Sequence, residues 1–182
     1  MAATRKLIVE KGYSDMTTKD VAKEAQVNEV TLFRQFGSKK ELLLTTLKEA
    51  EWIPSVNKEI YDQFQWDLTS DLHLMMEAYL TQVTPEIVRF SLGLRAQEIY
   101  QETMPYIEKI PTAFIQTLED YLIRMKSKKQ VKIHDPKKSA EIIFSSMIGF
   151  AFLHAYSSSD QYEKEVEIFI SDAIDQFING LI

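Results

Sequence analysis

The sequence contains no cysteine. This absence excludes disulfide bonds, zinc sites with cysteine ligands and thiol catalysis, and it is compatible with the reducing cytoplasm in which we expect the protein to reside. Glycine and proline are scarce, with five of each among 182 residues. Because these two residues punctuate secondary structure most strongly, their scarcity favours long helices. No long run alternates apolar and polar residues as a sheet would, so we expect an all-α fold.

One apolar stretch could be mistaken for a membrane span. Residues 142–156 read IIFSSMIGFAFLHAY and fall short of the ~20 residues that cross a bilayer. The stretch also contains Ser145, Ser146 and His154. Residues 1–6 lack the apolar core of a signal peptide. We therefore expect no membrane association, and we interpret residues 142–156 as a buried helix at a subunit or domain interface.

Motifs for catalysis are also missing. We find no glycine-rich phosphate loop, nucleophile elbow or paired catalytic carboxylates. The three histidines, His73, His134 and His154, are far apart in the sequence, which argues against a metal site. The sequence therefore predicts no catalytic residue, no metal ligand and no cofactor, and we do not expect an enzyme.

Charge is distributed unevenly along the chain. The net charge is −6, which is unusual for a nucleic-acid binder. Residues 1–50, however, hold nine basic and seven acidic residues, a net charge of +2, so the remainder carries −8. This asymmetry points to a basic binding end on an acidic body.

Capping and stop signals in the sequence mark the ends of the N-terminal helices. Gly12 is expected to stop a first helix over residues 3–11. Thr17, followed three positions later by Asp20, resembles a capping box and opens a second helix that ends near residues 25–26. The first helices are therefore predicted to be short.

Two further helices follow in the same manner. Asn28 is a strong N-cap for a third helix over residues 29–35, which Gly37 stops. A capping box over residues 38–41 opens a fourth helix, which we expect to run to residues 53–54. The three-residue joint between the second and third helices is typical of a helix-turn-helix motif. Apolar contacts that would fix its angle come from Val21, Ala22, Ala25, Val27, Leu32 and Phe36.

The rest of the chain also predicts helices. Pro85, Pro105 and Pro136 stand at or near predicted helix starts, where a missing N–H is tolerated. Pro111 lies inside a helical pattern and predicts a kink or a break. The expected segments are residues 56–65, 68–83, 85–101, 105–126, 136–157 and 164–181.

The first quarter of the chain contains a series of short motifs at fixed spacings. They are Lys11-Gly12-Tyr13, Thr17, Val21-Ala22, Ala25-x-Val27, Thr31-Leu32-Phe33 and Phe36-x-Ser38-Lys39-x-x-Leu42. In these motifs the segment resembles the DNA-binding head of the TetR (tetracycline-repressor) family, and the match is specific because several spacings agree at once. Two positions depart from the family: Gln26 stands where the turn usually has glycine, and Phe33 replaces a tyrosine whose hydroxyl contacts a phosphate.

The resemblance implies a helix-turn-helix DNA-binding domain over residues 1–46 and a helical effector-binding and dimerisation domain over 47–182. It also implies a homodimeric repressor of palindromic double-stranded DNA, released by a small hydrophobic or amphipathic ligand. Arg34 would hold guanine and Glu29 would accept a hydrogen bond from cytosine, although a solvated helix face is an alternative for each. The expected DNA-binding residues are Thr17, Thr18, Asn28, Glu29, Val30, Thr31, Phe33, Arg34 and Lys39.

Aromatic, methionine and polar residues of the body could line a ligand pocket, although most would serve equally as plain core. The expected effector-binding residues are Met75, Tyr79, Phe90, Leu94, Arg95, Glu98, Phe114, Tyr121, Met147 and His154. The last two helices commonly pair in dimers of this family. The expected dimer-interface residues are Phe144, Ile148, Phe152, Ile170, Ile174 and Phe177.

Two other functions fit the same sequence. The chain could be a helical small-molecule binder or enzyme that has lost effective DNA binding, which Phe33, Glu29 and the acidic total favour slightly. It could instead be a regulator whose signal is a protein partner rather than a small molecule.

Overall fold

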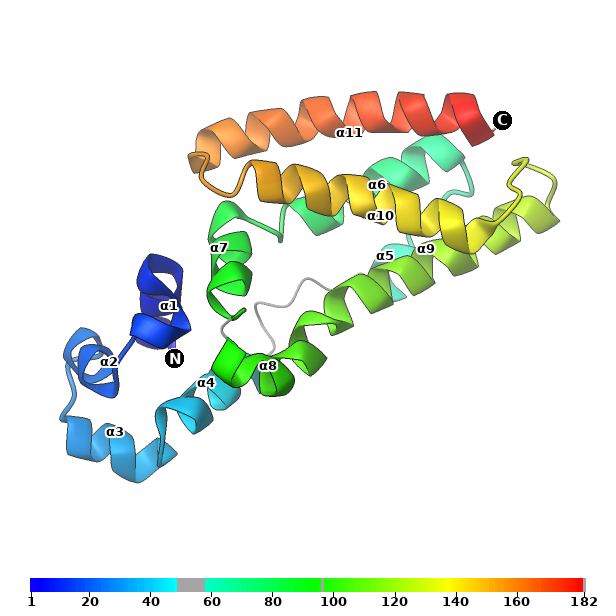
Figure 1. Ribbon diagram of the computed structural model, residues 1–182. Helices are drawn as coiled ribbons and strands as arrows, with labels where there is room; N and C mark the ends of the chain where they lie inside the picture. Colours follow the sequence, from blue (N-terminus) through cyan, green and yellow to red (C-terminus); the bar gives the residue numbers. More distant parts are fainter. Residues whose placement is uncertain (49–57, 96, 182) are drawn as a thin grey trace. The chain divides into compact units, whose positions relative to one another are not determined.

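The structure is a computed structural model that describes residues 1–48, 58–95 and 97–181 (Figure 1). Regular structure in this part of the chain is entirely helical, which confirms the predicted all-α class. None of its helices is long and apolar enough to cross a membrane. The elements are α1 (Ala2–Asp15), α2 (Thr18–Glu24), α3 (Glu29–Phe36), α4 (Lys39–Lys48), α5 (Lys58–Tyr61), α6 (Leu68–Leu80), α7 (Pro85–Gly93), the 3₁₀ helix η2 (Gln97–Ile99), α8 (Tyr100–Ile107), α9 (Lys109–Ser127), α10 (Pro136–Leu153) and α11 (Ser159–Leu181).

The chain folds into two compact units. The first unit contains α1 to α4 together with the segment from Glu86 to Glu108, and the second contains α5, α6, α9, α10 and α11. The domains expected from the sequence, 1–46 and 47–182, stay a proposal. The contacts add residues 86–108 to the compact unit that holds the N-terminal helices.

Capping residues set the ends of α2 and α3 as predicted. The Thr17 side chain accepts a hydrogen bond from the Asp20 N–H, and the Asp20 carboxylate accepts one from the Thr17 N–H, so the capping box is complete. The Asn28 side chain accepts from the Val30 N–H at the start of α3. Gly12 adopts φ 76° and ψ 167°, which breaks the helical run of α1 without ending it.

The core of the first unit includes residues from the later segment. Phe90, Leu94 and Ile99 are buried in one cluster with Ile8 and with leucines of α4. Gly93 lies so close to α1 that a Cβ at this position would stand 2.7 Å from the Ile8 carbonyl oxygen. The single helix expected over residues 85–101 is therefore interrupted: α7 ends at Gly93, and α8 begins at Tyr100.

Pro105 and Pro111 occupy different positions in their helices from those expected. Pro105 lies inside α8 rather than at a helix start. The chain breaks at Glu108, between α8 and α9, and Pro111 stands in the first turn of α9, where its missing N–H costs no intrahelical bond. The predicted break near Pro111 is thus present three residues earlier. The expected end of the fourth helix at residues 53–54, and the start of the next at 56, lie outside the described residues.

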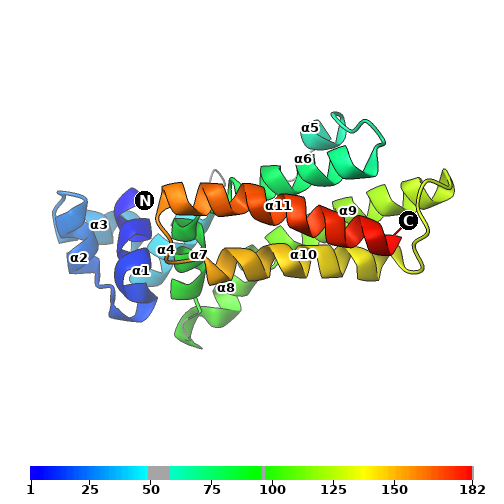
Figure 2. The ribbon, with the colours of Figure 1, turned by 90° about the horizontal axis from the view of Figure 1, so that it is seen from above.

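The second unit is a packed helical bundle. Helix α11 packs against α6 and α10, and α10 packs along α9 (Figures 1 and 2). Tyr79, Phe114 and Phe144 meet at its centre with ring centroids 5.2–5.5 Å apart, in the tilted and edge-on arrangements that aromatic quadrupoles prefer. Nearby, the buried Tyr121 hydroxyl donates to the Asp71 carboxylate at 2.9 Å, which satisfies both groups.

The helix-turn-helix joint stores backbone strain at one residue. Gln26 has φ 56°, in the left-handed region where a side chain costs about 1–2 kcal/mol. Glycine avoids that cost but loses about 0.5–1 kcal/mol through its greater freedom in the unfolded chain. We therefore expect Gln26→Gly to raise the free energy of unfolding by about 0.5–1 kcal/mol, measured by urea denaturation.

Gln35→Gly is the matched control, because Gln35 is exposed in α3 with ordinary helical geometry. That change should lower the free energy of unfolding by about 1 kcal/mol. Equal destabilisation by the two substitutions would refute the strain at position 26.

Candidate DNA interface and ligand groove

One face of α3 is buried and the opposite face is open to solvent. Leu32 anchors the helix in the core of the first unit. Val30, Thr31, Phe33 and Arg34 are all exposed. The capping residue Asn28 fixes where the helix begins, so α3 presents a defined row of exposed side chains, as a recognition helix does.

The acidic residues of the helix-turn-helix segment, residues 18–36, are engaged by neighbours. Asp20 accepts from the Lys11 ammonium at 2.8 Å, and Glu24 accepts from Lys6 at 2.6 Å. The Lys11 hydrogen bond is the main reason that the pKa of Asp20 lies well below its usual range. Glu29, the remaining acid of the segment, accepts from the Thr18 hydroxyl at 2.8 Å.

The basic residues of the same segment are not neutralised in this way. Lys19, Lys23 and Arg34 are exposed and form no ion pair with any described residue. Helix α1 thus supplies the lysines that offset two of the acids, and the cations of α2 and α3 are left facing water. An anionic polymer would meet unpaired positive charge at this surface.

Five expected DNA-binding residues have structural partners. Thr17 and Asn28 serve as helix caps, and Thr18 is bonded to Glu29. The Lys39 ammonium donates to the Ser14 carbonyl oxygen at 3.1 Å and lies 4.1 Å from the Tyr13 ring centroid. Lys39 therefore ties the start of α4 to the end of α1, and its role towards phosphate stays a prediction.

The expected effector-binding residues are divided between the two units. Phe90 and Leu94 are buried in the first unit, where Arg95 and Glu98 are exposed. The second unit holds the remaining six. Five of them are buried and His154 is half-buried, 4.5 Å from the Phe150 ring centroid. The buried five are Met75, Tyr79, Phe114, Tyr121 and Met147.

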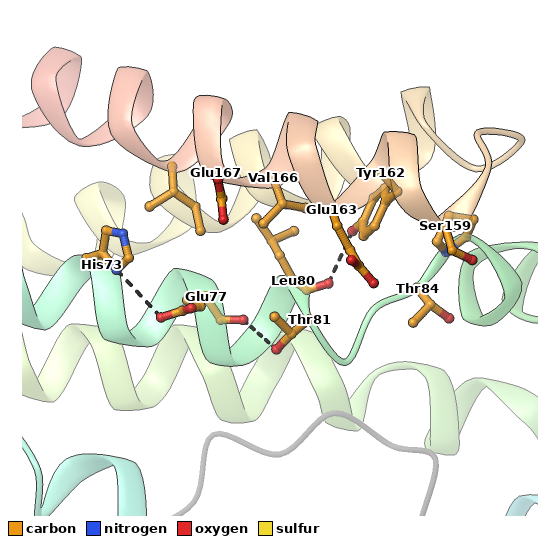
Figure 3. Close-up of a pocket in the computed structure, with 12 residues that line it drawn as sticks. His73, Glu77, Leu80, Thr81, Thr84, Ser159, Tyr162, Glu163, Val166 and Glu167 are labelled. Carbon is orange, nitrogen blue, oxygen red and sulfur yellow. Dashed lines mark hydrogen bonds and ion pairs between the residues drawn. The ribbon is translucent and has the colours of Figure 1, made fainter.

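A groove of about 340 Å³ lies in the second unit, between α6 and α11 (Figure 3). Its apolar part comes from Leu80, Tyr162, Val166 and Ile170. The Tyr162 hydroxyl donates to the Val83 carbonyl oxygen at 2.8 Å, and burial raises its pKa to about 12, so it remains a neutral donor.

Acidic side chains surround that apolar part. Glu163 and Glu167 extend from α11 towards α6, which carries Glu77 and His73 (Figure 3). The His73 ring lies 3.7 Å from the Glu77 carboxylate, and no lysine or arginine of the described part of the chain lines the groove. The sequence did not lead us to predict Glu77, Glu163 and Glu167 as ligand-binding residues. The available signal was the i,i+4 spacing of His73 with Glu77 and of Glu163 with Glu167, which places each pair on one helix face.

The expected dimer-interface residues divide by burial. Phe144, Ile170 and Ile174 are buried within the second unit itself, and Ile148, Phe152 and Phe177 are half-buried. Other large apolar residues of this region are more exposed. They are Ile142, Leu153, Tyr156 and Ile168. Among the described residues, no cluster of three or more histidine, aspartate or glutamate side chains could hold a metal ion.

Comparison with known proteins agrees with the geometry of the first unit. Residues 1–46 match the family described as bacterial regulatory proteins, tetR family. The uncharacterized HTH-type transcriptional regulator YvkB of Bacillus subtilis is 28% identical over 159 residues, which cover 87% of this chain and 82% of that protein.

Solved structures share the fold over nearly the whole chain. FadR from Bacillus subtilis, in complex with stearoyl-CoA, is similar with a TM-score of 0.74 and 17% identity, covering 98% of this chain and 96% of that one. NalD, the secondary repressor of the MexAB-OprM multidrug efflux pump in Pseudomonas aeruginosa, is similar with a TM-score of 0.71 and 15% identity, covering 100% and 93%. The capped helix-turn-helix, the cations of α2 and α3 and these likenesses lead to one conclusion: residues 1–46 are a helix-turn-helix segment of the tetR family of bacterial regulatory proteins, and the chain as a whole is similar to DNA-binding transcriptional regulators of that family.

Proposed function

We propose that the protein is a homodimeric repressor that binds palindromic operator DNA and is released by a small hydrophobic or amphipathic molecule. The observation that carries this proposal is the distribution of charge over residues 18–36. Two of its acids are paired with lysines of α1, while Lys19, Lys23 and Arg34 have no ionic partner among the described residues. An acidic protein thereby presents these cations on α2 and at Arg34 of α3, the helix that would enter a major groove.

The homodimer is supported by exposed apolar surface on α10 and α11. Leu153 is 87% exposed and Ile168 is 58% exposed, and Ile142 and Tyr156 are exposed in the same region. Removing such side chains from water is favourable by about 25 cal/mol for each Å² of apolar surface. A second copy would cover them through an isologous interface, and two heads related by a two-fold axis would match a palindromic operator.

The groove between α6 and α11 supports an amphipathic effector. Leu80, Val166 and Ile170 would contact an apolar body, and the carboxylates of Glu163 and Glu167 would face its polar end. Those carboxylates disfavour an anionic head, so a large acyl anion such as the stearoyl-CoA bound to FadR suits this groove poorly. We propose an apolar molecule with a neutral or cationic head for this site.

Release from DNA would follow from differential binding. An effector that binds more tightly to the conformation with low operator affinity shifts the protein towards that conformation. The same factor by which the effector lowers DNA affinity must appear as a reduction of effector affinity when DNA is bound.

DNA binding should depend steeply on salt, because each neutralised phosphate releases counterions. Lys19→Ala should reduce the slope of log K against log salt by about one, measured by fluorescence anisotropy on duplexes selected from a random library. Arg34→Ala should also broaden the sequences selected. Lys132→Ala, an exposed cation of the second unit, is the matched control and should leave the slope unchanged. If the folded protein bound no duplex even at low salt, the chain would instead be a small-molecule binder without DNA-binding activity.

The oligomeric state can be tested at an exposed position. Leu153→Glu should convert a micromolar dimer to a monomer in sedimentation equilibrium, because the charge would be buried unpaired at the interface. Ile123→Glu is the control, since Ile123 is 47% exposed but lies on α9, and this variant should remain dimeric. A wild-type protein that sediments as a stable monomer at micromolar concentration would contradict the proposal.

The effector class can be tested with two ions of the same shape and opposite charge. Tetraphenylphosphonium should raise the melting temperature and weaken DNA binding, whereas tetraphenylborate should do neither, because of the carboxylates around the groove. The double variant Glu163→Gln with Glu167→Gln should lose most of this response. Glu165→Gln, a carboxylate of α11 outside the groove lining, should keep it. Equal responses to both ions, or a response unchanged in the double variant, would rule the groove out as the effector site.

A further inference from the structure

Exposed apolar side chains gather on the helix-turn-helix of the first unit. Val30 is 73% exposed, Phe33 is 61% exposed and Val27 is 45% exposed. Tyr100 is the one other large apolar side chain with comparable exposure among the described residues of that unit. Single exposed apolar residues need no explanation, but three within seven positions of one motif form a patch that a partner would cover.

Helical geometry places Val30 at the centre of the exposed face of α3. Each residue of an α-helix turns by about 100°, so Val30 points roughly 160° away from the buried anchor Leu32. Phe33 and Arg34 follow at i+3 and i+4, on the same face one turn later. The residue that a docked surface would meet first on α3 is therefore a valine rather than a hydrogen-bonding side chain.

Glu29, the polar residue beside Val30, is already hydrogen-bonded within the protein. The Glu29 carboxylate accepts a hydrogen bond from Thr18 at 2.8 Å, and the Val30 N–H is held by the Asn28 cap. Phe33 has no hydroxyl to offer a phosphate. The first turn and a half of α3 therefore offers the Val30 methyl groups and the Phe33 ring beside the Thr31 hydroxyl, while the cations lie at Lys19, Lys23 and Arg34.

Together these features indicate one binding partner for the patch, which is duplex DNA contacted through its major groove. The surrounding cations favour a polyanion over an apolar protein surface. In the major groove the apolar feature is the C5 methyl group of thymine, and every other base edge displays donors and acceptors. A valine that faces base edges is complementary to that methyl group and cannot form hydrogen bonds with the donors and acceptors of the other base edges.

We propose that Val30 is a specificity-determining residue that recognises one thymine in each operator half-site through its C5 methyl group, with Phe33 covering the same contact. This inference rests on the proposed DNA-binding function. It is separate from the reading of guanine by Arg34, because it concerns a contact without any hydrogen bond.

Replacement of thymine by deoxyuridine tests the contact directly. Deoxyuridine keeps the O4 acceptor and the base pair and lacks only the methyl group. Duplexes selected by the wild-type protein from a random library would be substituted at one thymine at a time. The wild-type affinity should fall roughly fourfold at one thymine of each half-site, the loss expected for one buried methyl group at about 0.8 kcal/mol.

Val30→Ala should bind the selected duplex more weakly and should no longer distinguish thymine from deoxyuridine at that position. Because Val30 is largely exposed, this variant should keep the wild-type circular dichroism and melting temperature. Gln35→Ala is the control on the same helix, because Gln35 is exposed on α3 and is not among the expected DNA-binding residues, and it should retain the wild-type discrimination.

The outcomes separate this inference from the proposed function. Selection of no duplex at all would overturn both. DNA binding without any thymine that is sensitive to deoxyuridine, or with a sensitivity that persists in Val30→Ala, would overturn the role of Val30 alone and leave the regulator intact.

Discussion

The close approach of α7 to α1 at Gly93 is the contact on which the first unit depends. A Cβ at position 93 would lie 2.7 Å from the Ile8 carbonyl oxygen and 2.8 Å from its side chain, and backbone cannot yield at such distances. Glycine alone permits the two helices to meet there. The approach brings Phe90 and Leu94 into the core that also contains the buried leucines of α4. A segment that is distant in sequence thereby becomes part of the unit that contains the helix-turn-helix.

Local signals in the sequence were sufficient to predict the helix-turn-helix. The other features depend on contacts between residues distant in the sequence, which local patterns do not indicate. Thr17 and Asn28 cap helices through bonds to residues two or three positions away, so their role can be derived from spacing alone. Gly93, where α7 ends, is in close contact with Ile8, 85 positions earlier, and no local pattern in the sequence indicates that contact. The expected effector-binding residues were equally ambiguous, because apolar side chains such as Tyr79 and Phe114 suit a core as well as a pocket. The groove required knowledge that α6 and α11 face each other, although the spacing of Glu163 and Glu167 was visible.

Helix α1 connects the electrostatics of the interface to this mechanical contact. Ile8 faces α7, while Lys6 and Lys11 reach across to Glu24 and Asp20 of α2. A displacement of α1 would therefore change two things together: the position of α2, and how well the acids beside the cations of the helix-turn-helix are neutralised. Exposed ion pairs of this kind contribute little to stability, so they can be rearranged at little cost in folding free energy. Because binding to a polyanion depends on the local charge, a small shift of one helix could change DNA affinity without unfolding any part of the recognition helix.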